Sequence, residues 1–190
     1  MTRSSSTRPR SRSSSIVSLR SLRSSDRAPI EAILRATNVF NDAEIAVALE
    51  LVDAPASAGY RFIVAEIDST PIDARGRSLA RATKPSTALP RVAGYACFGA
   101  TPLTQGTFDL YWIAVDPALH GSGVGRALMQ ATEDAIRKES GRLMIIETAS
   151  KPSYDKTRAF YVAWGCEEVA RIRDFYTIGD DKVVYARRLA

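Results

Sequence analysis

The sequence predicts a single α/β domain with a mixed central sheet of about seven strands flanked by helices. Short apolar segments with strand character alternate with amphipathic helical segments from residue 15 to residue 190. A strand, a helix and a strand follow one another over residues 108–146, at the spacing of a parallel crossover. Two aromatic-rich strands at residues 91–99 and 108–115 are joined by a short turn, which indicates an antiparallel hairpin.

The positive charge of the chain is concentrated at its beginning. The 190 residues include 26 Lys and Arg against 21 Asp and Glu, for a formal charge of +5. Residues 1–14 are rich in Ser and Arg, hold four of those arginines and no acid, and have only Met1 as an apolar residue. We expect a disordered tail, because this segment cannot bury enough apolar surface to offset its ordering entropy. The remainder is almost neutral, so we expect no nucleic-acid partner.

Composition also limits location and chemistry. The start resembles an organellar transit peptide in composition, but a plain basic tail is the preferred interpretation. It lacks the apolar core of a secretory signal, and no run of about 18 apolar residues occurs, so we expect no membrane span. Cys97 and Cys166 stand far apart, which favours a reducing, cytoplasmic setting. With His120 as the only histidine, neither a zinc site nor a Ser-His-Asp relay is expected.

The N-terminal half is expected to form two strands and two helices. They are a strand near residues 16–22, a helix over 26–39, a helix over 42–53 and a strand over 60–68. Asp26 and Asp42 are the expected N-caps, because their carboxylates can accept the free N–H groups of a first helical turn. Residues 69–90 are polar and contain three prolines, which indicates a long loop or a tolerated insertion.

The C-terminal half supplies the rest of the expected fold. Its elements are strands at 91–99 and 108–115, a helix ending at Gly141, a strand at 143–146, a helix at 154–164, and strands at 166–176 and 182–189. The run LMII at 143–146 is wholly apolar, as in a strand buried on both faces. The last hairpin gathers charged and aromatic residues that either contact a cationic amine or face solvent. These are Arg171, Asp174, Phe175, Tyr176, Asp180 and Asp181.

The most specific local signal is a glycine-rich loop between a strand and the helix that it opens. It consists of His120, Gly121, Ser122, Gly123, Val124, Gly125 and Arg126. Closely spaced glycines expose backbone N–H groups, and the helix N-terminus adds partial positive charge, so a phosphate is the natural ligand. A Walker loop needs Lys and then Ser or Thr, where this sequence has Arg126 and Ala127. The dinucleotide fingerprint fails too, because Arg126 occupies its third glycine position.

Two motifs resemble those of the GNAT N-acetyltransferase superfamily. The pattern His-x-x-Gly-x-Gly at residues 120–125 is similar to its acyl-CoA loop, usually Gln or Arg, two residues, Gly, any residue, then Gly or Ala. Residues 154–161 and the downstream Gly165 are similar to its later helix motif, which ends in Phe-Tyr. The expected element order matches the family over residues 15–190. The resemblance therefore implies a GNAT-like fold.

The resemblance also implies direct acetyl transfer from acetyl-CoA to a primary amine of a small molecule or a protein. It assigns acetyl-CoA binding to the loop residues 120–126. It assigns binding of the carbonyl oxygen and the pantetheine arm to backbone groups near Ala114 and Val115, where the family's strands splay apart. Tyr161 matches the position that protonates the departing thiolate. A non-catalytic acyl-CoA sensor on the same fold is the alternative, and the acceptor and the oligomeric state stay open, a homodimer included.

A base is required, because an alkyl ammonium must lose a proton before it can attack a thioester. Glu147 follows the apolar strand at its carboxyl edge, where open α/β sheets bind ligands and loss of water contact would make a carboxylate more basic. It is the first candidate, and the alternative is a structural carboxylate that caps the end of the sheet or pairs with Arg158. Asp109 is the second candidate, and it shares a face with Tyr111 and Ile113 if side chains alternate along the strand.

Overall fold

A computed structural model describes residues 17–67 and 90–189, which form the predicted order of strands and helices. The elements are β1 (Val17–Arg20), α1 (Arg27–Ala36), α2 (Asp42–Asp53), β2 (Arg61–Ile67), β3 (Arg91–Ala100), β4 (Thr107–Val115), α3 (Val124–Lys138), β5 (Leu143–Ala149), α4 (Asp155–Trp164), β6 (Glu167–Thr177) and β7 (Asp180–Arg188). The expected tail and nearly all of the loop at 69–90 lie outside the described residues.

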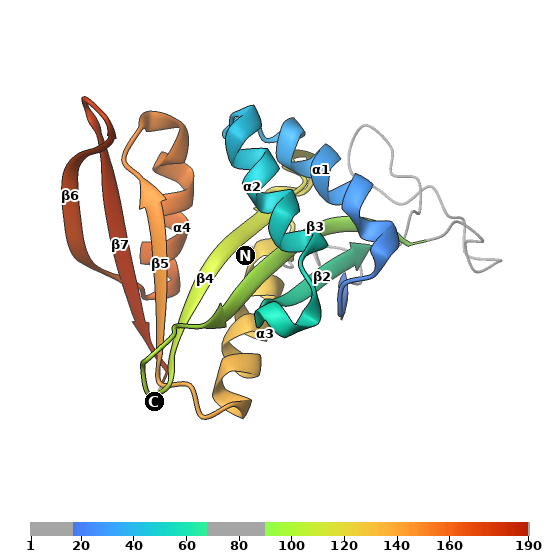
Figure 1. Ribbon diagram of the computed structural model, residues 1–190. Helices are drawn as coiled ribbons and strands as arrows, with labels where there is room; N and C mark the ends of the chain where they lie inside the picture. The colour runs from blue at the N-terminus through green and yellow to red at the C-terminus, as the bar shows by residue number, and fades with distance from the viewer. Residues whose placement is uncertain (1–16, 68–89, 190) are drawn as a thin grey trace, which may run out of the picture.

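The strands form one seven-stranded sheet in the order β1-β2-β3-β4-β5-β7-β6 (Figure 1). β4 and β5 pair in parallel and are connected through α3, whereas the other neighbouring strands pair antiparallel. The predicted crossover, the predicted β3–β4 hairpin and the mixed sheet of about seven strands are therefore confirmed.

Helices cover the two faces of this sheet unequally. α1 and α2 pack on one face through Ile30, Leu34 and Ile45, in a cluster with side chains of β2, β3 and β4. α3 and α4 pack on the opposite face, where Leu128 and Tyr161 join a second cluster that reaches β5 and β7. In Figure 1, α1 and α2 lie over the β2–β4 side, and no helix of the described residues covers the same face of β5, β7 and β6.

The uncovered face changes the interpretation of β5. Met144 and Ile146 are buried on the α3–α4 face, whereas Leu143 and Ile145 are only half-buried on the other face. The expectation that this run is buried on both faces is therefore wrong. Its cause is the missing helix layer above β5, a property of the tertiary structure that an apolar run of four residues does not reveal.

β4 contains a bulge that re-aims its side chains. Leu110 and Trp112 pair with consecutive residues of β3, and Tyr111 between them has no partner in the ladder. An extra residue reverses the alternation of faces beyond it. Ile113 therefore packs with the cluster on the α3–α4 face, as Leu110 does. The expected common face of Asp109, Tyr111 and Ile113 is wrong for Ile113.

The parallel pairing of β4 and β5 ends early. Residues 107–110 pair with residues 143–146, and the pairing stops at Leu110 and Ile146. Both strands continue, β4 to Val115 and β5 to Ala149, and Figure 1 shows their upper halves diverging. The splay implied by the family resemblance is thus present, and it leaves backbone groups of both strands facing a gap.

The two expected N-caps behave differently from the prediction. Asp26 precedes α1, but its carboxylate accepts hydrogen bonds from the Arg20 guanidinium and from the Arg23 backbone N–H (2.7 Å). At α2 the cap is Asn41, whose side chain accepts from the Glu44 N–H at 2.9 Å. The Glu44 carboxylate accepts from the Asn41 N–H at 2.7 Å, which completes a capping box. Asp42 is therefore the first helical residue and not the cap.

This capping box predicts unequal effects of two neighbouring substitutions. Asn41→Ala removes an accepted N–H bond at the helix start and should lower the free energy of unfolding by about 1 kcal/mol. Asp42→Ala removes an ion pair of a highly exposed carboxylate with Arg35 and should cost less than about 0.5 kcal/mol. Urea unfolding of both variants measures the difference. A larger loss for Asp42→Ala would restore Asp42 as the cap.

Candidate active site

A cavity of about 420 Å³ lies between the diverging end of β4, the loop before α3, and α4. Its lining consists of Ile113, Val115, Leu119, His120, Gly121, Gly123, Gly125, Arg126, Lys156, Thr157 and Phe160. The volume is typical of a small-molecule site. Six of the predicted binding residues thus surround one cavity.

A larger hollow of about 830 Å³ lies beside α1 but offers less chemistry. Its charged side chains are already engaged with one another. The Arg20 guanidinium binds Asp26 and Glu66, both at 2.6 Å, and Arg91 binds Asp116 at 2.7 Å. We therefore place the candidate active site at the smaller cavity, where cations and backbone donors converge.

The glycine-rich loop presents unpaired backbone donors to the cavity. Gly121 (φ 79°) and Gly123 (φ 99°) adopt the left-handed conformation, and Gly123 is the N-cap of α3. The loop N–H groups without a protein acceptor within the described residues are those of Gly121, Gly123, Val124, Gly125 and Arg126. The N–H of Ser122 is taken by the Leu119 carbonyl at 3.1 Å. Free donors at the start of a helix favour an anion.

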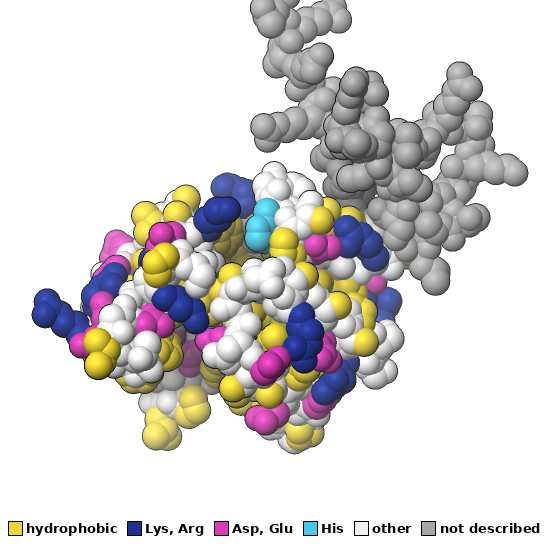
Figure 2. All heavy atoms as spheres, turned by 90° about the horizontal axis from the view of Figure 1, so that it is seen from above, with side chains coloured by type: hydrophobic (Ala, Val, Ile, Leu, Met, Phe, Trp, Pro, Cys, Tyr) yellow, Lys and Arg dark blue, Asp and Glu magenta, His cyan; other side chains and the backbone are white. Residues whose placement is uncertain are grey.

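The charges around the cavity favour an anion as well. Arg126 and Lys156 contribute cationic side chains, and no acidic residue is part of the described lining. Figure 2 looks down on the molecule and shows basic side chains beside the single histidine (cyan) on this surface. The cavity is thus positive at its loop end and apolar at Ile113, Val115 and Phe160.

The strand pattern determines which backbone groups of β4 face the gap. Asp116 donates its N–H to the Ala93 carbonyl at 2.9 Å. Hydrogen-bonded and non-hydrogen-bonded pairs alternate along an antiparallel ladder, so the next pair, Val115 and Gly94, is not hydrogen-bonded. The N–H and carbonyl groups of Val115 therefore point away from β3 and toward the β5 side. His120 Nε2 lies 3.2 Å from the Val115 carbonyl oxygen. Val115 therefore has the orientation that the family resemblance implied.

Three predicted binding residues do not line the cavity with their side chains. Ala114 is buried in the cluster on the α1–α2 face, because it alternates with Val115. Val124 is 1% exposed and packs in the core cluster on the α3–α4 face, where it fixes the start of α3. Ser122 donates its hydroxyl to the Leu119 carbonyl at 2.6 Å. Ser122 and Val124 therefore shape the loop, and Val124 also offers its N–H group.

Tyr161 is more deeply buried than the sequence suggests. From the sequence, ordinary packing of an aromatic ring on the sheet is expected more for Phe160 than for Tyr161. In the structure Phe160 packs against the core cluster and also lines the cavity, whereas Tyr161 is 5% exposed and packs beside Tyr185, with ring centroids 5.8 Å apart. Burial raises the pKa of the Tyr161 phenol well above its ordinary value, so the group stays protonated.

Glu147 is the first residue of β5 beyond the parallel pairing, but it is not desolvated. Its side chain is 51% exposed, and its carboxylate lies 2.5 Å from Lys182 Nζ on β7. The expected loss of water contact is therefore wrong, because this face of β5 is uncovered. The expected pairing with Arg158 is wrong as well, since Arg158 instead donates to the carbonyl oxygens of Ala149 (2.6 Å) and Lys151 (3.2 Å).

Asp109 lies within the paired segment of β4 and away from the gap. It is opposite Ile145 in the parallel ladder, so it shares the face of Glu147. Its carboxylate accepts a hydrogen bond from the Thr101 hydroxyl at 2.7 Å. The structure places neither carboxylate in the cavity lining; both lie on the opposite face of the sheet.

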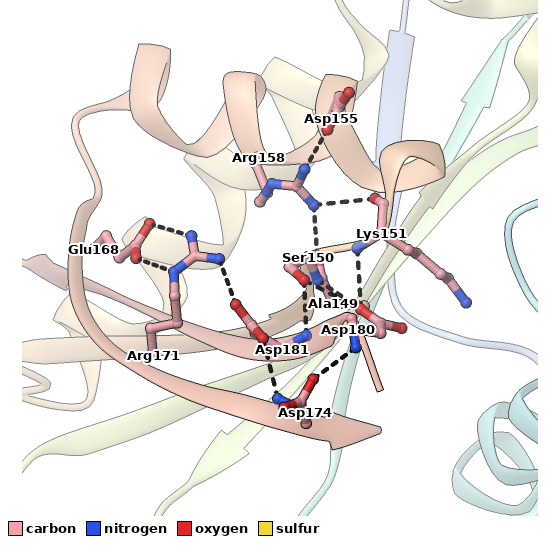
Figure 3. A network of polar contacts seen from close by, with 11 residues as sticks. Ala149, Ser150, Lys151, Asp155, Arg158, Glu168, Arg171, Asp174, Asp180 and Asp181 are labelled. Atoms are coloured by element: carbon pink, nitrogen blue, oxygen red, sulfur yellow. Dashed lines mark hydrogen bonds and ion pairs between the residues drawn. The ribbon is translucent and has the colours of Figure 1, made fainter. Parts of the chain in front are cut away.

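The acidic hairpin at the end of the chain is structural, as Figure 3 shows. Asp180 is 7% exposed and accepts from the backbone N–H groups of Ser150 (2.9 Å) and Lys151 (3.0 Å). Asp181 accepts from the Asp174 N–H and from Arg171, both at 3.1 Å. The Asp180 carboxylate thus holds the residues after β5 to the start of β7, and the Asp181 carboxylate binds β6. Asp180 is therefore not simply solvated.

Several lining residues were not predicted as binding residues. Lys156, Thr157 and Phe160 come from α4, and Ile113 and Leu119 flank the loop. Phe160 lies one helical turn after Lys156 and Thr157, so this spacing was an available signal once the helix was placed. Ile113 reaches the cavity because of the bulge in β4.

Within the described ranges, 17–67 and 90–189, no group of three or more His, Cys, Asp or Glu side chains is arranged to hold a metal ion. None of their helices combines the length and apolar character needed to span a membrane.

The loop geometry predicts opposite effects of alanine at two of its glycines. Gly123→Ala places a side chain in the left-handed region and should destabilise the fold by about 1 kcal/mol. Gly125 is helical, and a Cβ there would lie 3.7 Å from Val115 Cγ2, so Gly125→Ala should be neutral or stabilising by up to about 1 kcal/mol. Chemical denaturation measures both. Equal losses would mean that the conformation of Gly123 does not matter.

Comparison with known proteins agrees with this architecture. The sequence matches the family model of the acetyltransferase (GNAT) domain over residues 58–168. A Desulfovibrio desulfuricans protein assigned to the GNAT family of acetyltransferases is 36% identical, with a TM-score of 0.76 over 92% of this chain and 100% of that chain. Among curated proteins no sequence gives a significant match.

More distant structures share the fold. One is a Salmonella typhimurium protein classed as an acetyltransferase and solved with its cofactor acetyl-CoA, with 20% identity and a TM-score of 0.64 over 93% of this chain and 95% of that chain. Another is the ribosomal-protein-S18-alanine N-acetyltransferase of Escherichia coli, with 18% identity and a TM-score of 0.64 over 92% of this chain and 95% of that chain. Taken with the family model and the 36% identical relative, these findings show that the chain belongs to the GNAT acetyltransferase family.

Proposed function

We propose that this protein transfers an acetyl group from acetyl-CoA to a primary amine. One observation carries the proposal: a cavity with unpaired helix N-terminal N–H groups and two cationic side chains lies against the end of β4, beyond its last pair with β5. A phosphate-bearing ligand that ends in a slender arm is the chemistry that such a site recognises. Membership of the family supports the same ligand.

The residues present fit acetyl-CoA, which supplies a thioester-activated acetyl group. The unpaired N–H groups of the loop, those of Gly121 and of residues 123–126, would hold a phosphate, and Arg126 and Lys156 would balance its charge. The outward peptide groups of Val115 would bond the amide-containing arm as a neighbouring strand does. An N–H near the end of β4 would donate to the acetyl carbonyl oxygen as charge develops on it.

The two faces of the sheet support separate entry of the two substrates. The cavity lies on the α3–α4 face, whereas Glu147 lies on the opposite face immediately beyond the last β4–β5 pair. An amine approaching from the Glu147 side would meet the acetyl group in the gap. Glu147 is our first candidate for the group that accepts the ammonium proton, directly or through water, and Asp109 is the second.

Tyr161 is our candidate for the opposite proton transfer. As the carbon–nitrogen bond forms, the carbon–sulfur bond breaks and the sulfur leaves with the electron pair of that bond. A neutral phenol can then give this thiolate a proton. Burial raises the pKa of Tyr161, so the phenol keeps its proton at neutral and mildly alkaline pH.

The direct test of the function is a thiol-release assay with acetyl-CoA and a panel of primary amines. We expect free CoA to accumulate only when a suitable amine is present, together with an equal amount of acetylated amine. Tight binding of CoA by calorimetry without transfer to any amine class would instead support the non-catalytic sensor.

The choice of base predicts a difference between two conservative variants. Glu147→Gln should lower kcat by about 100-fold or more, because the amine then loses its proton acceptor. Asp109→Asn, on the same face but within the paired segment, should lower kcat by less than about threefold. Turnover of both variants at saturating acetyl-CoA decides between them. The reverse order would assign the base to Asp109.

The proton donor predicts a rate effect without a binding effect. Tyr161→Phe should lower kcat at least about tenfold and leave the CoA dissociation constant nearly unchanged, because only the hydroxyl is lost. Since the pKa of Tyr161 is raised, the wild-type rate should not fall from loss of this proton between pH 7 and about 9.5. Full turnover of Tyr161→Phe would remove Tyr161 from the mechanism.

A further inference from the structure

We infer that Trp164 is a positioning residue that holds the Arg126 guanidinium at the mouth of the cavity, and that buried Glu133 fixes Trp164 for this task. The inference rests on the proposed function, because it takes the phosphate-bearing end of CoA as the ligand of Arg126. It concerns residues outside both sequence motifs, and Trp164 does not line the cavity.

The orientation of Trp164 is determined by a buried carboxylate. Trp164 is the last residue of α4, and its indole Nε1–H donates to Glu133 Oε1 of α3 at 2.6 Å. Glu133 is 2% exposed. A short hydrogen bond from a half-buried ring to a fully buried charged acceptor leaves the indole little freedom to turn.

Glu133 is itself held from three elements. Besides the indole, its carboxylate accepts from Arg187 Nε of β7 at 3.0 Å and from Arg137 of α3 at 2.8 Å. Two guanidinium groups and one indole thus satisfy a carboxylate that burial would otherwise penalise. The carboxylate is therefore a fixed point to which the ring of Trp164 is attached.

The Arg126 guanidinium lies over the face of the Trp164 ring. The Arg126 Cζ atom lies 5.3 Å from the centroid of the Trp164 ring, within the range of a cation–π interaction. Phe160, which lines the cavity, is a neighbour of this ring, with its centroid 6.3 Å from that of Trp164. The guanidinium is thus held where α3 begins, next to the unpaired N–H groups of the loop.

An aromatic face restrains a guanidinium in a way that a carboxylate cannot. An acidic partner would neutralise the charge and compete with an incoming phosphate for the N–H donors. A ring restrains the long side chain and leaves both its charge and its N–H edges available. Ordering Arg126 before the ligand arrives lowers the entropy lost on binding, so Trp164 should raise affinity for the phosphate-bearing part of CoA alone.

A double-mutant cycle on CoA binding tests this inference. The variants are Trp164→Leu, Arg126→Ala and the double variant, with dissociation constants for CoA and for phosphate-free pantetheine measured by calorimetry. Trp164→Leu should weaken CoA binding about three- to tenfold when Arg126 is present and less than about twofold in the Arg126→Ala background. Pantetheine binding should not change in any variant.

Two further variants separate positioning from stability. Arg137→Ala removes one donor to Glu133 but contacts neither Trp164 nor Arg126, so it should lower the unfolding midpoint and leave CoA affinity unchanged. Trp164→Phe keeps an aromatic face without the indole N–H, so it should rescue part of the affinity lost in Trp164→Leu. If Trp164→Leu folds poorly, Trp164→Phe replaces it in the double-mutant cycle.

The outcomes distinguish this inference from the proposed function. Additive losses in the cycle, or an equal loss of pantetheine binding, overturn the role of Trp164 while acetyl transfer by the wild type stands. A coupled cycle in a protein that transfers no acetyl group supports Trp164 and overturns the proposed reaction. A wild-type protein that binds no CoA overturns both.

Discussion

Parallel pairing between β4 and β5 lasts for four residue pairs and then ends, and the organisation of the candidate site depends on this ending. Beyond Leu110 the bulge at Tyr111 turns β4 away, and backbone groups that a continuous sheet would pair face a gap instead. The cavity lies against the end of β4 on the α3–α4 face, and Glu147 lies on the opposite face just beyond the last β4–β5 pair. The same interruption therefore creates the binding groups and separates the two approaches to them.

The free edge of β5 is stabilised by contacts elsewhere. β7 pairs with β5 as far as Ala149, and beyond that point Asp180 and Arg158 bind the N–H and carbonyl groups of residues 149–151. On the α3–α4 face the Glu133 carboxylate joins α3, α4 and β7. The first network gives polar partners to the backbone that follows β5, and the second joins the elements packed on the α3–α4 face.

Local patterns in the sequence predict much of this fold. The crossover follows from the amphipathic period of α3 between two apolar strands, and the loop 120–126 follows from glycines that adopt positive φ in the structure. The N-cap of α2 was also within reach, because Glu44 stands three residues after Asn41 and not after Asp42. The family motifs placed Val115 and Arg126 at the cavity.

What the sequence did not predict depends on contacts between distant segments. Lys182 lies 35 residues beyond Glu147, and only the pairing of β5 with β7 brings them together. Tyr161 is more deeply buried than Phe160, and two neighbouring aromatic residues carry no signal for which of them faces the core more fully. The exposure of Glu147 follows from a helix layer that ends at β4, which no property of β5 itself reveals.

The central claim is that donor and amine meet in the gap from opposite faces, in one complex and without an acetylated enzyme. Steady-state rates measured over a grid of acetyl-CoA and amine concentrations test it most directly. Our account predicts double-reciprocal lines that intersect, because both substrates must be bound before the acetyl group moves. Parallel lines, together with release of CoA before amine is added, would show a covalent acetyl-enzyme and contradict the account.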